Sequence, residues 1–173
     1  MAWTTTNFLN IGPLTNDSYD FTITDLVPSA KYRYRSYFIV DGVEYYGNVL
    51  TGQTAAIELS NPILITGNAQ FATASTVYVP NNTINNDGNT EIIEYGILYT
   101  QFSAYGTNTN LIYENYPTHM NKVSICSSVP VLPYNYNNTI SGLTSSTNTF
   151  YRAFARNAHG VGYGTIETKV TTS

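Results

Sequence analysis

Residues 22–54 read TITDLVPSAKYRYRSYFIVDGVEYYGNVLTGQT, and residues 139–171 read TISGLTSSTNTFYRAFARNAHGVGYGTIETKVT. The two stretches align without gaps at an offset of 117 residues, and 10 of the 33 aligned pairs are identical. Self-similarity at one fixed offset is the signature of a repeated supersecondary unit. The chain therefore contains two copies of one structural element.

Each copy predicts two strands joined by a turn. Strands are expected at 31–40 and 43–54 in the first copy, and at 148–156 and 161–171 in the second. Alternation of apolar and polar residues between turn signals is typical of half-buried antiparallel strands. No stretch of the chain shows helical periodicity, so the sequence predicts an all-β protein.

A corner precedes the first strand of each copy. The spacing of Leu26, Pro28 and Tyr32 resembles the E–F corner of fibronectin type III domains. In those domains a Tyr at the start of strand F turns its hydroxyl back onto the corner backbone. The resemblance implies that Tyr32 is buried, with its hydroxyl bonded to backbone near Leu26 to Pro28. The second copy has Ser145 and Thr149 in place of the Pro and the Tyr, so its corner must be held in another way.

The second copy also resembles the fibronectin type III and Ig-like repeats of bacterial surface proteins and of tailed-phage structural proteins. The matching residues are Gly142 to Asn157, the pair Tyr163-Gly164, and Glu94 to Tyr99, which looks like strand C. The resemblance covers about 60–173 and, as a half-module, 20–54. It implies an antiparallel β-sandwich, a fold that hosts many functions.

The sequence predicts three regions: a partial module at 1–55, a linker at 56–61 and a complete sandwich at 62–173. Strands of the sandwich are expected at 62–66, 69–79, 91–101, 110–115, 121–128, 135–141, 148–156 and 161–171, with a turn at Pro80 to Asn82. Further strands of the partial module are expected near 2–9 and 18–24.

The first copy lacks the strands that normally cover it. Only about 20 residues precede its E-like strand, too few for strands A, B and C. Its edges would be unpaired and its apolar positions uncovered. Those positions are Phe21, Ile23, Leu26, Tyr32, Tyr34 and Phe38. Three explanations stay open: the half-module packs on the second domain, it is completed by another chain or copy, or the chain is a fragment.

Strand alternation places a stripe of Arg and aromatic side chains on the outer face of the sheet. Its members are Arg33, Arg35 and Tyr37 in the first copy, and Phe150, Arg152, Phe154 and Arg156 in the second. One interpretation is packing across strands, with neighbours such as Tyr163 or Glu94. The other is a contact surface, since Arg and Tyr are enriched at protein interfaces.

The composition argues against several classes of partner. Charged residues make up 10% of the chain, and seven Lys and Arg with a net charge of −4 give no footprint for nucleic acid or an anionic membrane. No apolar run approaches the ~18 residues of a membrane span. The start at Met1 lacks the basic and apolar regions of a signal peptide, which favours a chain that folds in a cytoplasm.

Residues suited to catalysis or metal binding are sparse. His119 and His159 are the only histidines, and neither has the spacing of a zinc ligand. Residues 85–89 slightly resemble a calcium loop, but Asp-Gly favours a hairpin turn. Cys126, the only cysteine, lies in an apolar run and is expected to be a small buried residue. We expect no catalytic residue, no metal and no cofactor.

These features predict a non-enzymatic protein that acts through contacts with other proteins. The resemblance implies a structural part of a phage virion, either a capsid auxiliary or decoration protein or a head fibre, on the exterior of the capsid or an appendage. Its partners would be other virion proteins or copies of itself. One alternative is an adhesive or carbohydrate-binding module at a bacterial cell surface, with surface proteins or a glycan as the partner. A further alternative is an accessory domain of a secreted enzyme.

Overall fold

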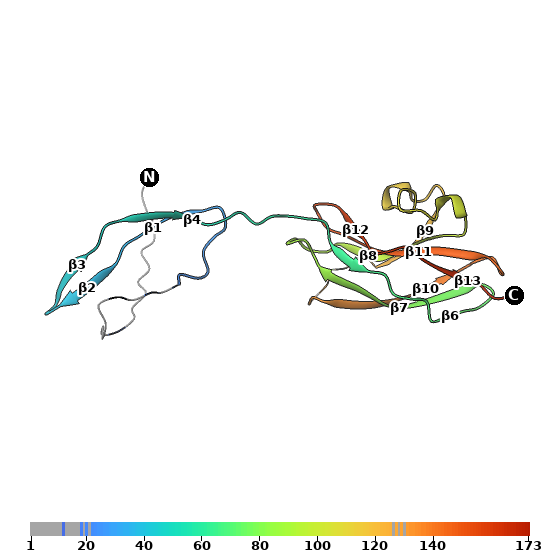
Figure 1. The fold of residues 1–173 in the computed structure, drawn as a ribbon, viewed down its shortest axis with the longest axis horizontal. Coiled ribbons are helices and arrows are strands. Elements are labelled where there is room, and N and C mark those ends of the chain that lie inside the picture. Colours follow the sequence, from blue (N-terminus) through green and yellow to red (C-terminus); the bar gives the residue numbers. More distant parts are fainter. Residues whose placement is uncertain are drawn as a thin grey trace. The chain divides into compact units, whose positions relative to one another are not determined.

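The computed structural model of the 173-residue chain describes residues 12, 18, 20, 22–125, 127, 129 and 131–173. The chain divides into two compact units, Met1–Ala56 and Ile57–Ser173 (Figure 1). This division falls beside the linker predicted at 56–61. The strand predicted at 2–9, and the expectations for Phe21 and Cys126, lie outside the described residues.

The C-terminal unit is an antiparallel β-sandwich of the fibronectin type III and Ig-like kind. One sheet has the order β10-β7-β5, with β6 also paired to β7, and the other has the order β12-β11-β8-β9, with β13 also paired to β11. The strands are β5 (Ile63–Ile65), β6 (Phe71–Ala72), β7 (Thr76–Asn86), β8 (Glu94–Thr100), β9 (Asn121–Ile125), β10 (Tyr134–Ser141), β11 (Asn148–Arg156), β12 (Val161–Tyr163) and β13 (Glu167–Val170). In the lettering of such domains β8 is strand C, β11 is strand F, and β12 with β13 is strand G.

Alternate side chains of both sheets fill the space between them. Val77 of β7, Ile97 of β8 and Ile140 of β10 are fully buried, and they pack with Tyr151 of β11. Burying one such side chain contributes about 1.5–3 kcal/mol. The C-terminal unit therefore has a hydrophobic core of its own.

The outer face of the β12-β11-β8-β9 sheet is covered as well. Residues 101–120, which include the short 3-10 helices η1 (Ser103–Tyr105) and η2 (Tyr113–Asn115), connect β8 to β9. Leu111 and Met120 of this segment pack with Leu98 and Phe154 of the sheet, and all four are buried. The prediction of a strand at 110–115 is wrong, because the backbone there closes turns, with Leu111 N donating to Thr107 O at 2.9 Å.

Strand β7 continues through Pro80 to Asn82, so the turn predicted there is also wrong. The backbone is bent at Asn81, which has a φ of 57°, and the pairing with β10 shifts its register nearby. The buried Asn82 amide satisfies the local backbone, since its Oδ1 accepts from Gly67 N at 3.0 Å and its Nδ2 donates to Val79 O at 3.2 Å. The turn residues thus form a β-bulge instead of a reversal.

Two predicted strands are divided in the structure. The strand predicted at 69–79 is a hairpin of β6 and the start of β7, and the one predicted at 161–171 is β12 followed by β13. Residues 58–61 of the predicted linker belong to the C-terminal unit. Ser60 N donates to Gly88 O at 3.0 Å, and Asn89 Nδ2 donates to Glu58 O at 2.8 Å.

The described part of the N-terminal unit is a long β hairpin. Its first arm holds β1 (Lys31–Tyr34) and β2 (Tyr37–Val40), and its second arm holds β3 (Val43–Tyr46) and β4 (Leu50–Gln53). Asp41 and Gly42 join the arms with φ values of 50° and 81°, as a type I′ turn requires. The described residues of the strand predicted at 18–24 lie outside any strand.

The N-terminal hairpin has the same strand pairing as the hairpin of strands F and G in the C-terminal unit, with each residue offset by 117 positions. The equivalent pairs are Lys31–Gln53 and Asn148–Val170 at the base, and Tyr37–Tyr46 and Phe154–Tyr163 toward the tip. The corner residues Ser29 and Ser146 both have positive φ, at 55° and 50°. The described hairpin therefore repeats the F–G element of the sandwich.

Candidate protein-interaction surface

The corner of the N-terminal hairpin is held by Tyr32 and Thr54. Val27 N donates to the Tyr32 hydroxyl at 2.6 Å, the bond expected of a tyrosine corner. Thr54 Oγ1 donates to Val27 O at 2.6 Å and accepts from Ala30 N at 3.0 Å. Tyr32 is half-buried rather than buried, because no described strand of a second sheet lies over it. The corner is thus closed by side chains of the hairpin itself.

The second corner has a threonine at the position of Thr54 and uses a glutamine in place of the hydroxyl of Tyr32. Thr171 Oγ1 donates to Thr144 O at 2.6 Å and accepts from Thr147 N at 3.0 Å, the same bonds at the same offset. Gln101, which follows β8, accepts from Thr144 N at 2.8 Å and donates to Thr149 Oγ at 3.2 Å. Gln101 therefore replaces the missing corner tyrosine, a role that no motif around Gln101 in the sequence signals.

The inner face of the hairpin is exposed where its repeat is buried. Tyr34 is 46% exposed and its equivalent Tyr151 is 1% exposed. Phe38 is 50% exposed, whereas Ala155 at the same position is fully buried. The large exposed apolar side chains of the hairpin are Tyr34, Phe38, Ile39, Val40, Val43, Tyr45, Tyr46, Val49 and Leu50. The cross-strand pairs Tyr34–Leu50, Phe38–Tyr45 and Val40–Val43 place six of these side chains on the inner face, and exposed apolar surface of this kind marks interaction sites in soluble proteins.

The side chains on this face are also larger than those of the repeat. In the C-terminal unit β5 passes so close to Gly162 that a Cβ there would lie 1.8 Å from Pro62 O. The hairpin has Tyr45 at that position, and its ring stacks on Phe38 with centroids 5.0 Å apart. A strand placed as β5 is placed would collide with this pair. The face therefore suits a layer of side chains rather than a closely packed backbone.

One contact of the predicted stripe is present in both copies. The guanidinium of Arg35 lies 3.7 Å from the centroid of the Tyr46 ring, and that of Arg152 lies 4.5 Å from the Tyr163 ring. Arg152 also donates from Nη2 to Gly164 O at 2.8 Å. Packing across strands, one of the two interpretations of the stripe, therefore describes these arginines.

The two halves of the stripe differ in exposure. Arg152 and Phe154 are buried under residues 101–120, so the expectation of an open contact stripe is corrected there. Phe150 and Arg156 are half-buried. In the hairpin Arg33 and Arg35 are exposed and Tyr37 is half-buried. The difference arises because only the C-terminal unit carries a covering segment among the described residues.

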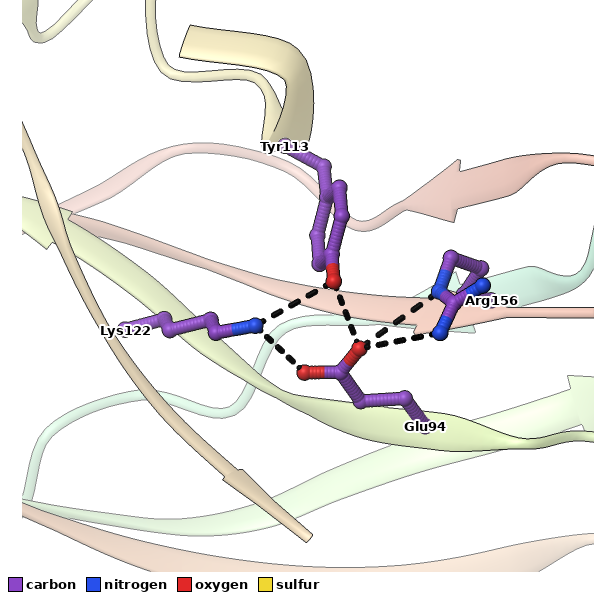
Figure 2. A network of polar contacts seen from close by, with 4 residues as sticks. All are labelled: Glu94, Tyr113, Lys122 and Arg156. Carbon is purple, nitrogen blue, oxygen red and sulfur yellow. Dashed lines mark hydrogen bonds and ion pairs between the residues drawn. The ribbon is translucent and has the colours of Figure 1, made fainter. Parts of the chain in front are cut away.

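A polar network lies on the outer face of the C-terminal unit (Figure 2). The Glu94 carboxylate, only 3% exposed, accepts from Lys122 Nζ at 2.7 Å and from the Tyr113 hydroxyl at 2.6 Å, and it lies 3.4 Å from Arg156 Nη2. Burial by itself raises the pKa of Glu94, but the hydrogen bonds from Lys122 and Tyr113 outweigh it and lower the pKa to about 2. The network ties η2 and β9 to strands β8 and β11.

The remaining chemistry of the described residues is sparse. They contain no group of three His, Cys, Asp or Glu side chains placed to hold a metal ion. Among them, no helix has the length and apolar character needed to cross a membrane. The exposed hairpin face is therefore the feature of the described chain that most clearly points to a function.

No protein-family model matches the sequence, and no curated protein matches it. Among solved structures, the sensor domain of the anti-sigma factor RsgI4 from Pseudobacteroides cellulosolvens is 16% identical with a TM-score of 0.46, over 66% of this chain and 97% of that one. The FN1–FN3 domains of chicken CNTN1 are 12% identical with a TM-score of 0.41, over 86% and 45% of the two chains. Domains d3–d4 of rat CD45 are 14% identical with a TM-score of 0.39, over 99% and 80%.

Proposed function

We propose that this chain is a non-enzymatic assembly protein whose N-terminal hairpin binds a neighbouring protein. The observation that carries the proposal is the contrast between equivalent residues of the two copies. Tyr151 and Ala155 are buried in a sandwich, whereas Tyr34 and Phe38 are about half exposed. The repeat thus keeps the geometry of the F–G element while presenting its inner face.

The size of the exposed face gives the energetic reason for a partner. Burying a large apolar side chain contributes about 1.5–3 kcal/mol. Phe38, Tyr45 and Leu50 are each close to half exposed, so covering them would add several kcal/mol to an association. Tyr residues at 45 and 46 and Arg at 35 belong to the residue types that dominate protein interfaces.

The setting that we propose is the exterior of a tailed-phage virion, as a capsid auxiliary or decoration protein or a head fibre. The support is the resemblance of Gly142 to Asn157 to repeats of phage structural proteins, together with the low charge content of the chain. A bacterial cell surface is the second setting, because related repeats occur there as well. Capsid, portal or tail genes beside the gene would favour the virion, and a gene for a membrane- or wall-anchored neighbour would favour the cell surface.

Incorporation into particles tests the contact directly. Particles are assembled in the presence of the tagged chain, purified, and assayed for the amount of tag that they retain. We expect the double variant Phe38→Asp with Tyr45→Asp to be lost from the particles while the parent chain is retained. Val131→Asp is the matched control, because Val131 is 73% exposed and lies in the C-terminal unit. Equal retention of the hairpin variant and the control would contradict the proposal.

A further inference from the structure

We propose that two copies of this chain pair through strand β10 of the C-terminal unit, antiparallel, across a twofold axis at Asn138. The two β10 strands join the β10-β7-β5 sheets of both copies into one continuous sheet. The inference goes beyond the proposed function, which concerns the hairpin of the N-terminal unit. Variants of β10 and variants of the hairpin therefore test the two proposals separately.

Strand β10 is a long border strand without the usual protection. It spans Tyr134–Ser141, and β7 is its only partner among the described strands. Natural border strands are protected from further pairing by charged side chains, by Pro, by bulges or by being short. The border strands β9 and β13 of the other sheet carry Lys122, Glu167 and Lys169. The sequence of β10, YNYNNTIS, has no charged residue and no Pro, so this edge is suited to strand addition.

The hydrogen bonds of β7 show which residues of β10 face the outer edge. Thr76 O accepts from Thr73 N at 2.9 Å, so Thr76 faces the side of β6. Alternate residues of an antiparallel strand direct their backbone groups to opposite sides. Val77 therefore faces β10, where it lies opposite Ile140. The even-numbered residues of β10 thus face β7, and the odd-numbered residues face the outer edge, namely Asn135, Asn137, Thr139 and Ser141.

The same alternation selects the position of the axis. Two identical antiparallel strands exchange backbone hydrogen bonds only where their edge-facing residues lie opposite each other. An axis at Asn138 pairs every edge-facing residue of one copy with one of the other, Asn137 with Thr139 and Asn135 with Ser141. A shift of the axis by one residue places Ser141 opposite Pro133, which has no N–H, or Asn135 beyond the end of the partner strand. The axis at Asn138 therefore gives the longest ladder.

An independent observation points to the same axis. The side chain of Asn138 lies on the inner face, is 6% exposed, and has a buried Oδ1 that accepts no hydrogen bond from any described residue. Leaving a buried amide unsatisfied is costly, and nearly all such groups in native proteins have a partner. At the axis the two Asn138 residues form a pair without backbone hydrogen bonds, with Cα atoms about 4.5 Å apart. Each Oδ1 then accepts from the Nδ2 of the other copy.

The outward side chains of β10 are complementary in this register. Asn137 Oδ1 accepts from Asn81 N at 3.0 Å, which holds this amide on the outer face of the sheet. Its Nδ2 can donate to Thr139 Oγ1 of the other copy, because the two residues lie opposite each other. Asn135 lies opposite Ser141 in the same way. The pairing therefore matches donors with acceptors and brings no like charges together.

Blocking the edge tests the pairing, with sedimentation equilibrium of the full chain as the measurement. The parent chain is expected to form dimers. Thr139→Pro removes an N–H that faces away from β7, so the fold should be kept, as circular dichroism would show. Dimerisation should weaken by at least about tenfold, because the symmetric interface loses two backbone hydrogen bonds. Thr139→Val keeps the N–H, and this matched control should dimerise nearly as the parent does.

Replacing the axis amide separates its role in the monomer from its role in the dimer. Asn138→Val removes a buried polar group that lacks a partner, so the urea midpoint of the monomer should be unchanged or higher. Dimerisation should weaken by about tenfold, because the two amides at the axis are lost. An unchanged dimer would show that the amide takes no part in the interface, and would overturn the axis.

Cysteines test the register in a Cys126→Ser background. Asn138→Cys should give a disulfide-linked dimer on oxidation, because its Cα atoms lie within the range of a disulfide. Thr139→Cys should stay unlinked, since an axis at Asn138 sets these Cα atoms more than about 7 Å apart. The opposite result would overturn the register.

Two further outcomes would overturn the pairing as a whole. One is a parent chain that is monomeric at every concentration, in which case particle retention would still test the proposed function. The other is a dimer that survives Thr139→Pro and is lost in the double variant Phe38→Asp with Tyr45→Asp, because the contact would then lie on the hairpin.

Discussion

The two corners of the repeat close the same backbone position with different side chains. At the first corner Val27 N donates to the hydroxyl of Tyr32, which lies five residues away on the same hairpin. At the second corner Thr144 N, the equivalent group, donates to Gln101 from the end of strand β8. A corner inside a complete sandwich can draw on strand C, whereas the first corner draws on its own strand F. The corner of the hairpin is therefore held in place although the described residues include no second sheet beside it.

The inner faces of the two copies differ in the size of their side chains. The C-terminal unit has Ala153, Ala155 and Gly162 where β5 packs closely against β11 and β12. The hairpin has Ser36, Phe38 and Tyr45 at the equivalent positions. Small residues permit close backbone packing, and large ones favour contact through side chains. The difference indicates close backbone packing on the inner face of one copy and contact through large side chains on the inner face of the other.

Exchanging residues at the equivalent positions 162 and 45 should give the largest effect on stability. Gly162→Tyr introduces the hairpin's residue where a Cβ would already collide with Pro62 O, and we expect a loss of at least about 3 kcal/mol in the free energy of unfolding. Tyr45→Gly should leave the unfolding of the C-terminal unit unchanged. Urea denaturation followed by circular dichroism measures both. Unfolding of Gly162→Tyr at the parent's urea midpoint would contradict the close packing of β5.

The second largest effect should be the loss of stability in acid, which we expect of the C-terminal unit and not of the hairpin. The Glu94 pKa lies at about 2 in the folded chain and near 4.5 in the unfolded chain, so the ionised carboxylate stabilises the fold. This contribution, about 3 kcal/mol, is complete above pH 4.5 and is lost as the pH falls toward 2. The hairpin has Ile39 at the position of Arg156, so it lacks this network. Glu94→Gln should therefore destabilise the chain at pH 7 and have little effect near pH 2.5, as urea midpoints at the two pH values would show. An equal loss at both values would contradict the assignment.

Removing the Gln101 amide at the second corner should cost about 1–2 kcal/mol, because it makes three hydrogen bonds, one of them to the buried Thr149. Gln101→Ala leaves Thr144 N without its partner. Thr149→Tyr in the same chain restores the tyrosine found at the first corner, and it should recover part of the loss. Thermal melting of the two single variants and the double variant measures the coupling between the positions. Strictly additive effects would show that Gln101 does not substitute for the tyrosine.

The smallest expected effect is at the first corner. Tyr32→Phe removes the acceptor for Val27 N, and we expect a cost of about 0.5–1 kcal/mol, because this bond is solvent-exposed. Hydrogen exchange at the Val27 amide should accelerate in the variant. An unchanged exchange rate would show that Tyr32 does not hold the corner.

The repeated hairpins could be predicted because alternation and turn residues act locally. Asp41-Gly42 specifies a two-residue turn, and that turn sets the register of both arms. The covering segment 101–120 was missed, although a signal for it exists. In β11 both Phe154 on one face and Tyr151 on the other are apolar, which is the pattern of a strand buried on both faces.

Side chains that act through distant contacts could not be predicted from local patterns. Nothing near Gln101 in the sequence links it to Thr144, because the two meet only after strands β8 and β11 have paired. Asn82 is a similar case, since its amide converts a turn signal at Pro80 into a bulge through contacts with Gly67 and Val79. In both cases a deciding partner, Gly67 for Asn82 and Thr144 for Gln101, lies far away in the sequence.

The central claim is that the N-terminal hairpin is an exposed copy of an element that is buried in the C-terminal unit. Residue-resolved hydrogen exchange measures this exposure most directly. At a concentration where the chain is monomeric, amides of β2 and β3 should exchange rapidly while those of β11 are protected. Within the assembled particle, β2 and β3 should become protected and β11 should remain so. Full protection of β2 and β3 already in the dilute monomer would contradict the account.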